Sequence, residues 1–260
     1  MDSILLGLVE GVTEFLPISS TGHLILVSHL LGAESATNKL FDIVVQLGAI
    51  LAVCWLYRAK LIATMGGMIE RQPAAWRFAC AILLGFVPAM VLGAALHDVI
   101  KDRLFNVAVV AFATLIGGIV IILVERFKRR PLIFTLDALP LPTCLMIGCF
   151  QCLAMIPGTS RSGATIIGAL LLNVDRRVAA EYSFFLAIPT MFAATFYDLY
   201  KTKILLTTAD VWMITIGFVT AFIAALVVVR WLIGFLSRHD FTVFGWYRIV
   251  LGIVMLVVLY

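Results

Sequence analysis

Six long apolar segments constrain the fold of this chain more than any other feature of its sequence. A helix needs roughly 20 apolar residues to cross the hydrocarbon core of a bilayer. The segments that come close to this length are Leu40–Tyr57, Phe78–Leu96, Leu104–Val124, Val178–Leu199, Ala209–Val229 and Val243–Tyr260. The composition agrees, because 63% of the residues are hydrophobic and only 13% are charged, whereas a soluble domain carries about 25% charged residues. The sequence therefore predicts an all-α polytopic membrane protein that forms a single integral membrane domain over residues 1–260.

A polar cluster interrupts an apolar stretch near the N-terminus, at Gly7–His23. Glu10 and Glu14 are about one helical turn apart, so a helix would place both carboxylates on one face. Pro17 then breaks the helix, and the Ser-Ser-Thr-Gly that follows is typical of a new helix start. The first helix would be about 20 Å long, too short for a hydrocarbon core of about 30 Å. We therefore predict a re-entrant helix–loop–helix over Ile4–Leu31.

A second stretch, Gly148–Thr165, repeats this pattern later in the chain. Aligning the two stretches pairs Gly7 with Gly148, Glu10 with Gln151, Ser19 with Ser160, Ser20 with Arg161, Gly22 with Gly163 and Ile25 with Ile166. A weaker match relates Gly85–Ala89 to Gly217–Ala221. We predict a duplicated unit of one re-entrant hairpin and three spans, with repeat 1 at about 1–125, a linker at about 126–142 and repeat 2 at about 143–260. Because each unit has an odd number of spans, the second copy should be inverted in the membrane.

Basic residues are unevenly distributed between the loops that this topology places on opposite sides. If the first hairpin enters from outside, the inside loops hold Arg58, Lys60, Arg71, Arg77, Arg126, Lys128, Arg129, Arg130, Arg176, Arg177, Arg230, Arg238 and Arg248. The outside loops hold only Lys39, Lys101, Arg103, Lys201 and Lys203. This asymmetry follows the positive-inside rule and predicts that both termini face outward. Since the basic residues lie in these loops, the net charge of +4 does not indicate a nucleic-acid partner.

The second broken loop, Pro157–Gly163, brings a permanent positive charge to membrane depth. Arg161 offers a planar fork of donors that suits a phosphate group. Each broken loop also leads into a helix N-terminus, which favours an anion. Hydroxyl groups in the two loops complete a predicted phosphate site, and they belong to Ser19, Thr21, Thr159, Ser160, Ser162 and Thr165.

The first loop adds groups that can do chemistry. Glu10 and Glu14 could hold a divalent cation, Mg²⁺ or Ca²⁺, because hard cations prefer oxygen ligands. Ser20 is a candidate nucleophile, and His23 or Glu14 is a candidate general acid or base. An exchange of roles between Ser20 and His23, or direct attack by a metal-bound water, stays open. A structural alternative is an ion pair between Glu10 and Arg161.

These residues carry a resemblance to a known family. Glu10–His23 reads E-x-x-x-E followed by P-x-S-S-T-G-H, and Pro157–Thr165 reads P-G-x-S-R-S-x-x-T. Both motifs are those of the undecaprenyl-diphosphate phosphatases called bacitracin-resistance proteins, which this chain closely resembles throughout. The essential residues that the resemblance implies are Glu10, Glu14, Ser20, His23 and Arg161, with Ser19, Ser160 and Thr165 close by.

The resemblance also implies an activity and a location. The protein would be a multi-pass enzyme of the bacterial inner membrane, dependent on a divalent cation, with an active site open to the periplasm. It would remove the terminal phosphate of undecaprenyl diphosphate, recycle that lipid carrier for peptidoglycan synthesis and confer bacitracin resistance.

Two other functions are alternatives. The acid-phosphatase-like lipid phosphatases would need a histidine at position 167, where this chain has Ile167, so that class is rejected. A transporter or flippase of polyprenyl phosphate lipids is the second alternative, because inverted repeats and broken helices are common in transporters. The combination of two Glu, Ser, His and Arg exceeds what phosphate binding alone requires. The sequence does not fix the oligomeric state, and a homodimer stays open.

Overall fold

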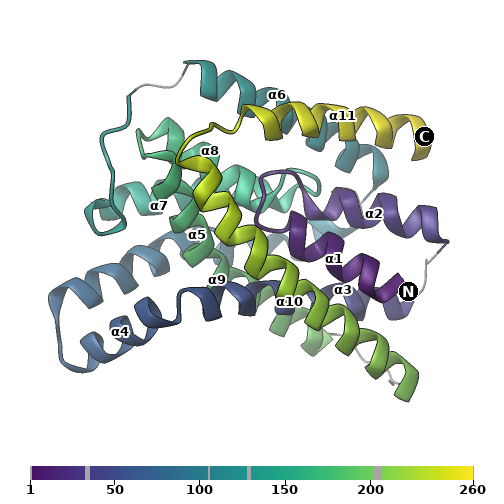
Figure 1. The fold of residues 1–260 in the computed structure, drawn as a ribbon, viewed down its shortest axis with the longest axis horizontal. Helices are drawn as coiled ribbons and strands as arrows, with labels where there is room; N and C mark the ends of the chain where they lie inside the picture. Colours follow the sequence, from purple (N-terminus) through teal and green to yellow (C-terminus); the bar gives the residue numbers. More distant parts are fainter. Residues whose placement is uncertain (1, 33–35, 105, 128–129, 202–206, 260) are drawn as a thin grey trace.

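The computed structural model describes residues 2–32, 36–104, 106–127, 130–201 and 207–259, and within them every regular element is a helix (Figure 1). In this part of the chain, five helices are long and apolar enough to cross a membrane, and a bent helix pair would make a sixth span. The predicted all-α polytopic class is therefore confirmed. Lys128, Arg129 and Lys203 lie outside the described residues, and so do the side chains of Lys39 and Lys101.

The first half begins with the predicted helix–loop–helix. Its helices are α1 (Asp2–Thr13) and α2 (Ser20–Leu31), followed by α3 (Ala36–Leu56), α4 (Arg58–Ile69), α5 (Pro73–Leu104) and α6 (Val107–Phe127). α1 and α2 pack against each other, so the chain turns back at Pro17 as expected. The sequence did not predict α4, which continues α3 after a bend of 71° at Tyr57.

The second half repeats this order of elements. After a short 3₁₀ helix, η1 (Leu136–Ala138), it contains α7 (Leu141–Gln151), η2 (Cys152–Met155), α8 (Arg161–Leu171), α9 (Arg176–Lys201), α10 (Thr208–Leu236) and α11 (Thr242–Leu259). The other predicted spans are confirmed, although the helix ends differ from the predicted ones; α5 extends furthest, to Leu104. α10 extends to Leu236, so Arg230 lies in this helix and not in the predicted inside loop. The boundaries of the two repeats stay a prediction.

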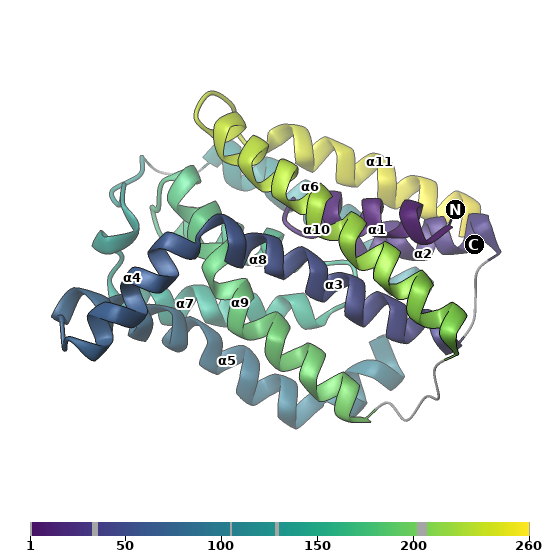
Figure 2. The ribbon, with the colours of Figure 1, turned by 60° about the horizontal axis from the view of Figure 1, so that its bottom comes forward.

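The two halves exchange packing partners. α1 packs along α10 and α7 along α5, while α6 and α11 lie side by side (Figures 1 and 2). Glycines allow two of these contacts: Gly7 lies against the carbonyl of Gly217, and Gly148 lies against the carbonyl of Gly85. A Cβ atom on either Gly7 or Gly148 would overlap the facing backbone. Each half therefore completes the packing of the other half's broken helix.

Apolar side chains from both halves enclose the two broken loops. Phe15, in the first loop, is fully buried and meets Phe184 of α9 edge to face, with ring centroids 5.6 Å apart. The same cluster includes Ile166 of α8 and Phe241, just before α11. The polar groups of the loops thus sit in an apolar, water-poor setting, where electrostatic interactions are stronger than in water. The described ends of α1 and α11 lie toward the same end of the molecule (Figure 2).

Candidate active site

Two loops interrupt the broken helices, one between α1 and α2 and one between η2 and α8, and each ends on a serine with a positive φ. Ser19 has φ +70° and accepts a hydrogen bond from the Gly22 N–H at 3.3 Å. Ser160 has φ +72° and accepts one from the Gly163 N–H at 3.1 Å. Non-glycine residues rarely adopt this conformation, and strained positions of this kind cluster at functional sites. The serines therefore cap α2 and α8 and turn the two helix N-termini into the same region.

Glu14 joins the two loops through its carboxylate. The Ser20 hydroxyl donates to Glu14 Oε2 at 2.6 Å, and Arg161 Nη2 donates to Glu14 Oε1 at 3.3 Å. A second Arg161 donor, Nη1, donates to the Ser183 carbonyl at 2.9 Å, whereas its buried Nε has no partner in the described part of the chain. The structure thus brings together three residues that the sequence predicted as catalytic. It also pairs Arg161 with Glu14, where the structural alternative had proposed Glu10.

Glu10 is the most deeply placed carboxyl group of the pair. It is 2% exposed, lies beside Glu14, and its Oε2 atom has no hydrogen-bond partner among the residues that the structure describes. A buried oxygen without a partner is costly unless a ligand satisfies it. Two neighbouring carboxyl groups and the Ser20 hydroxyl are hard oxygen donors, so this set fits a Mg²⁺ or Ca²⁺ ion. Among the described residues no three His, Cys, Asp or Glu side chains gather, so substrate and water would have to complete the coordination.

His23 is buried in α2, and both of its ring nitrogens have partners. Nδ1 is 2.8 Å from the Ser19 carbonyl oxygen, and Nε2 is 2.6 Å from the Tyr247 hydroxyl of α11. A carbonyl can only accept, so Nδ1 carries a proton and a neutral ring accepts at Nε2 from Tyr247. The two rings are also stacked, with an interplanar angle of 6°. Tyr247 was missed by the sequence analysis, because nothing in its local sequence points toward α2.

The remaining predicted hydroxyls divide into two groups. Ser162 and Thr165 are fully buried. Ser162 holds the two loops together, because its Oγ donates to the Leu16 carbonyl at 2.8 Å, and Thr165 joins α8 to α9, because its Oγ1 pairs with the Ser183 hydroxyl at 2.6 Å. Thr21, Thr159 and Ser160 are half-buried. Contact of any of these groups with phosphate stays a prediction.

Arg248 was assigned to an inside loop, and that prediction is wrong. The residue lies in the second turn of α11, is fully buried, and points into the broken loops. Its five N–H groups donate to five main-chain carbonyls at 2.8–3.2 Å, those of Pro17, Gly158, Thr159, Ala113 and Thr114. A basic residue near the end of an apolar run usually marks a loop, but here the packing of α11 against α6 turns it inward. Arg248 therefore fixes both loops to α6 and adds positive charge beneath them.

These features define a class: a polytopic membrane protein with a buried carboxylate–hydroxyl–guanidinium centre between two broken helices. The family model described as "Bacitracin resistance protein BacA" matches residues 3–254. The chain belongs to this bacitracin resistance protein family.

Relatives cover almost the entire chain. It is 52% identical over 254 residues to a protein of Aromatoleum aromaticum named undecaprenyl-diphosphatase, which covers 98% of this chain and 92% of that relative. A protein of the same name from Parvibaculum lavamentivorans is 51% identical over 257 residues, covering 99% of this chain and 96% of the relative. The "Undecaprenyl-diphosphatase 2" of Shewanella oneidensis is 50% identical over 253 residues, 96% of this chain and 94% of that protein.

Proposed function

We propose that this protein removes the terminal phosphate of undecaprenyl diphosphate and releases undecaprenyl phosphate. The observation that carries this proposal is the Glu14 carboxylate, which binds the Ser20 hydroxyl and the Arg161 guanidinium across two broken loops. The relatives named undecaprenyl-diphosphatase support the substrate. The product would re-enter cell-wall synthesis as a lipid carrier, and abundant enzyme would confer resistance to bacitracin.

In the reaction, Ser20 Oγ attacks the terminal phosphorus and the bond to the bridging oxygen breaks, so undecaprenyl phosphate leaves. Glu14 Oε2, 2.6 Å from Ser20 Oγ, takes the hydroxyl proton. Glu14 then gives this proton to the departing undecaprenyl phosphate and is a carboxylate again. A water next attacks the phosphoserine, Glu14 accepts a proton from that water and returns it to Ser20 Oγ, the bond between Ser20 Oγ and phosphorus breaks, and inorganic phosphate leaves. Arg161 neutralises charge on the phosphoryl oxygens, which is the main requirement of phosphoryl transfer.

His23 fits a supporting role better than that of base to Ser20. Both of its ring nitrogens face other groups, the Ser19 carbonyl and the Tyr247 hydroxyl. Through Ser19 it orients the loop that carries Ser20, and through Tyr247 it offers a route along which a proton can move.

We also propose a divalent cation, Mg²⁺ or Ca²⁺, held by Glu10 and Glu14. When bound, such an ion would neutralise phosphate charge as a Lewis acid. Glu10 supplies the better oxygen, because its Oε2 has no other partner, whereas both Glu14 oxygens are engaged.

The decisive experiment measures phosphate release from undecaprenyl diphosphate by purified protein in detergent, with and without a chelator. Undecaprenyl monophosphate serves as the control lipid, because it lacks the anhydride bond. We expect release from the diphosphate only, lost on chelation and restored by Mg²⁺ or Ca²⁺. Binding of the lipid without any phosphate release would reject the phosphatase and favour a lipid transporter.

The location follows the same proposal. A carrier lipid of the cell wall would be dephosphorylated in the bacterial inner membrane, with the two loops open to the periplasm. Assembly into a homodimer remains a proposal as well, which the mass of the detergent complex would test.

A further inference from the structure

An apolar groove leads from Arg161 to the outer surface of the helix bundle. It encloses about 340 Å³ between α5, η2 and α9, which is the size of a small-molecule site. Its lining includes Arg161, Gln151 and Thr190, and Gln151 donates to Thr190 at 3.2 Å. We call it the α5–α9 groove.

The exposed fractions of the lining residues show which end of the groove is buried and which end is open. Gln151 is 2% exposed and the Arg161 side chain 11%. Met90 and Tyr197, which also line the groove, are 46% and 39% exposed. The groove therefore runs from the charged centre to the part of the surface that faces lipid.

Small residues keep this path open. Gly93 of α5 and Ala193 and Ala194 of α9 line it, together with Ala154 and Met155 of η2. Of the described atoms, a Cβ atom on Gly93 would meet only the Met155 methyl group, at 3.7 Å across the groove. From Phe86 to Ala94 the α5 wall extends about 12 Å along the helix, so the groove suits an elongated apolar chain.

We infer that the α5–α9 groove holds the head-proximal part of the isoprenoid chain while the diphosphate lies at Arg161; this rests on the proposed function. The groove joins apolar walls to a guanidinium whose buried Nε has no partner. A lipid with an anionic head and a long hydrocarbon tail satisfies both ends at once.

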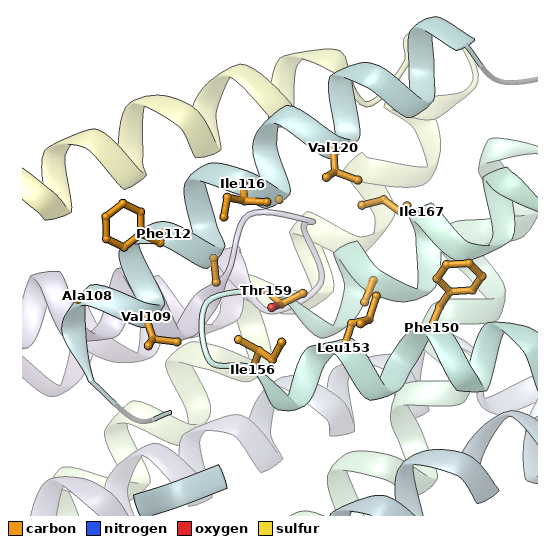
Figure 3. A pocket seen from close by; sticks show the side chains of 13 residues that line it. Ala108, Val109, Phe112, Ile116, Val120, Phe150, Leu153, Ile156, Thr159 and Ile167 are labelled. Atoms are coloured by element: carbon orange, nitrogen blue, oxygen red, sulfur yellow. The ribbon is translucent and has the colours of Figure 1, made fainter. Parts of the chain in front are cut away.

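A second groove provides an internal comparison. It encloses about 470 Å³ between α6, η2 and α8 and is lined by Phe112, Ile116, Phe150 and Ile156, among others (Figure 3). Among the described residues that line it, Thr159 has the one polar side chain and none is charged. This α6–α8 groove can therefore accept hydrocarbon but offers no cation for a diphosphate.

The test compares the same substitution in the two grooves. Ala193→Phe fills the α5–α9 groove and Ala108→Phe fills the α6–α8 groove; both alanines lie on helices that line the respective groove. Each variant is assayed with undecaprenyl diphosphate and with dimethylallyl diphosphate, whose single prenyl unit does not extend along the groove. We expect Ala193→Phe to raise KM for the long substrate about tenfold and to change kcat/KM for the short one less than about twofold. Ala108→Phe should leave both nearly unchanged.

Gly93→Ala is a smaller substitution that tests the same groove in case Ala193→Phe does not fold. The added methyl group fits at van der Waals distance from Met155, so this variant should fold and raise KM for the long substrate by about twofold to threefold. The inference fails if Ala193→Phe and Gly93→Ala leave the long substrate unaffected, or if Ala108→Phe raises its KM instead. If the wild-type protein releases phosphate from neither substrate, the proposed function on which the inference rests is rejected instead.

Discussion

Glu14 is the residue on which the two loops converge, and it gives the most direct test of the proposed chemistry. Glu14→Gln keeps the size of the side chain but removes the charge that accepts the Ser20 proton and pairs with Arg161. We expect kcat to fall at least about a hundredfold, equivalent to about 2.7 kcal/mol of barrier, with expression unchanged. Glu70→Gln, on the exposed end of α4, is the matched control and should keep full activity. Near-normal turnover in Glu14→Gln would leave Glu14 with a structural role only.

Arg161 tests whether the guanidinium acts as a fork or as a simple charge. Arg161→Lys keeps the charge but cannot donate to Glu14, Ser183 and a phosphoryl group in the same geometry. We expect kcat to fall more than KM rises, because charge on the phosphoryl group is greatest in the transition state. Steady-state kinetics distinguish this from a simple ion pair, for which turnover would be unchanged and KM modestly raised. Arg230→Lys, at an exposed site on α10, is the control.

Arg248 is predicted to hold the loops rather than to react. In Arg248→Lys, three N–H donors replace five, so at least two of the five main-chain carbonyls lose their partner. Each buried carbonyl without a partner costs about 1–3 kcal/mol, so the midpoint of thermal unfolding in detergent should fall clearly. The loss should be larger in Arg248→Met, which removes the charge as well. An unchanged unfolding midpoint in Arg248→Lys would show that the loops keep their shape without it.

At the scale of helices, the close glycine contacts between the two halves predict that Gly→Ala has different effects at two positions. Gly148→Ala places a methyl group against the Gly85 carbonyl and should force α7 away from α5. Gly66→Ala lies on a helix too, in α4, but its Cβ would meet nothing within 4 Å. The first change should lower the midpoint of thermal unfolding. The second should leave the midpoint unchanged or raise it slightly, because Gly→Ala at a compatible site stabilises the folded state by up to about 1 kcal/mol. Equal midpoints for both variants would contradict the close approach of α5 and α7.

The broken helices could be predicted from the sequence because their signals are local. Pro17 cannot continue a helix, and Ser19 and Ser160 are typical helix caps. The bend at Tyr57 and the inward side of Arg248 could not be predicted in the same way, since both depend on which helix packs alongside. The packing of α1 on α10 and of α7 on α5 was visible in the sequence only as weak internal similarity, around Gly7, Gly85, Gly148 and Gly217. The partner of each glycine required the folded chain.

For the whole molecule, the orientation in the membrane follows from where basic residues cluster. We predict that Lys201, at the end of α9, faces the periplasm and that Arg238, after α10, faces the cytoplasm. Single cysteines at these exposed positions, in a background without the five native cysteines, should be labelled accordingly by an impermeant thiol reagent in intact cells. Labelling of position 238 from the periplasm would reverse the topology.

Because α1 of the first half packs against α10 of the second half, the order of synthesis limits when the N-terminal hairpin can reach its final packing. α1 is synthesised before α10, the helix against which it packs. Glu14 gains its ion-pair partner when Arg161 of α8 is made, and the loops gain their contacts with Arg248 only when α11 follows. We therefore expect the α1–α2 hairpin to reach its final packing only after α10 is made, and a chain truncated before α10 should be less stable in the membrane.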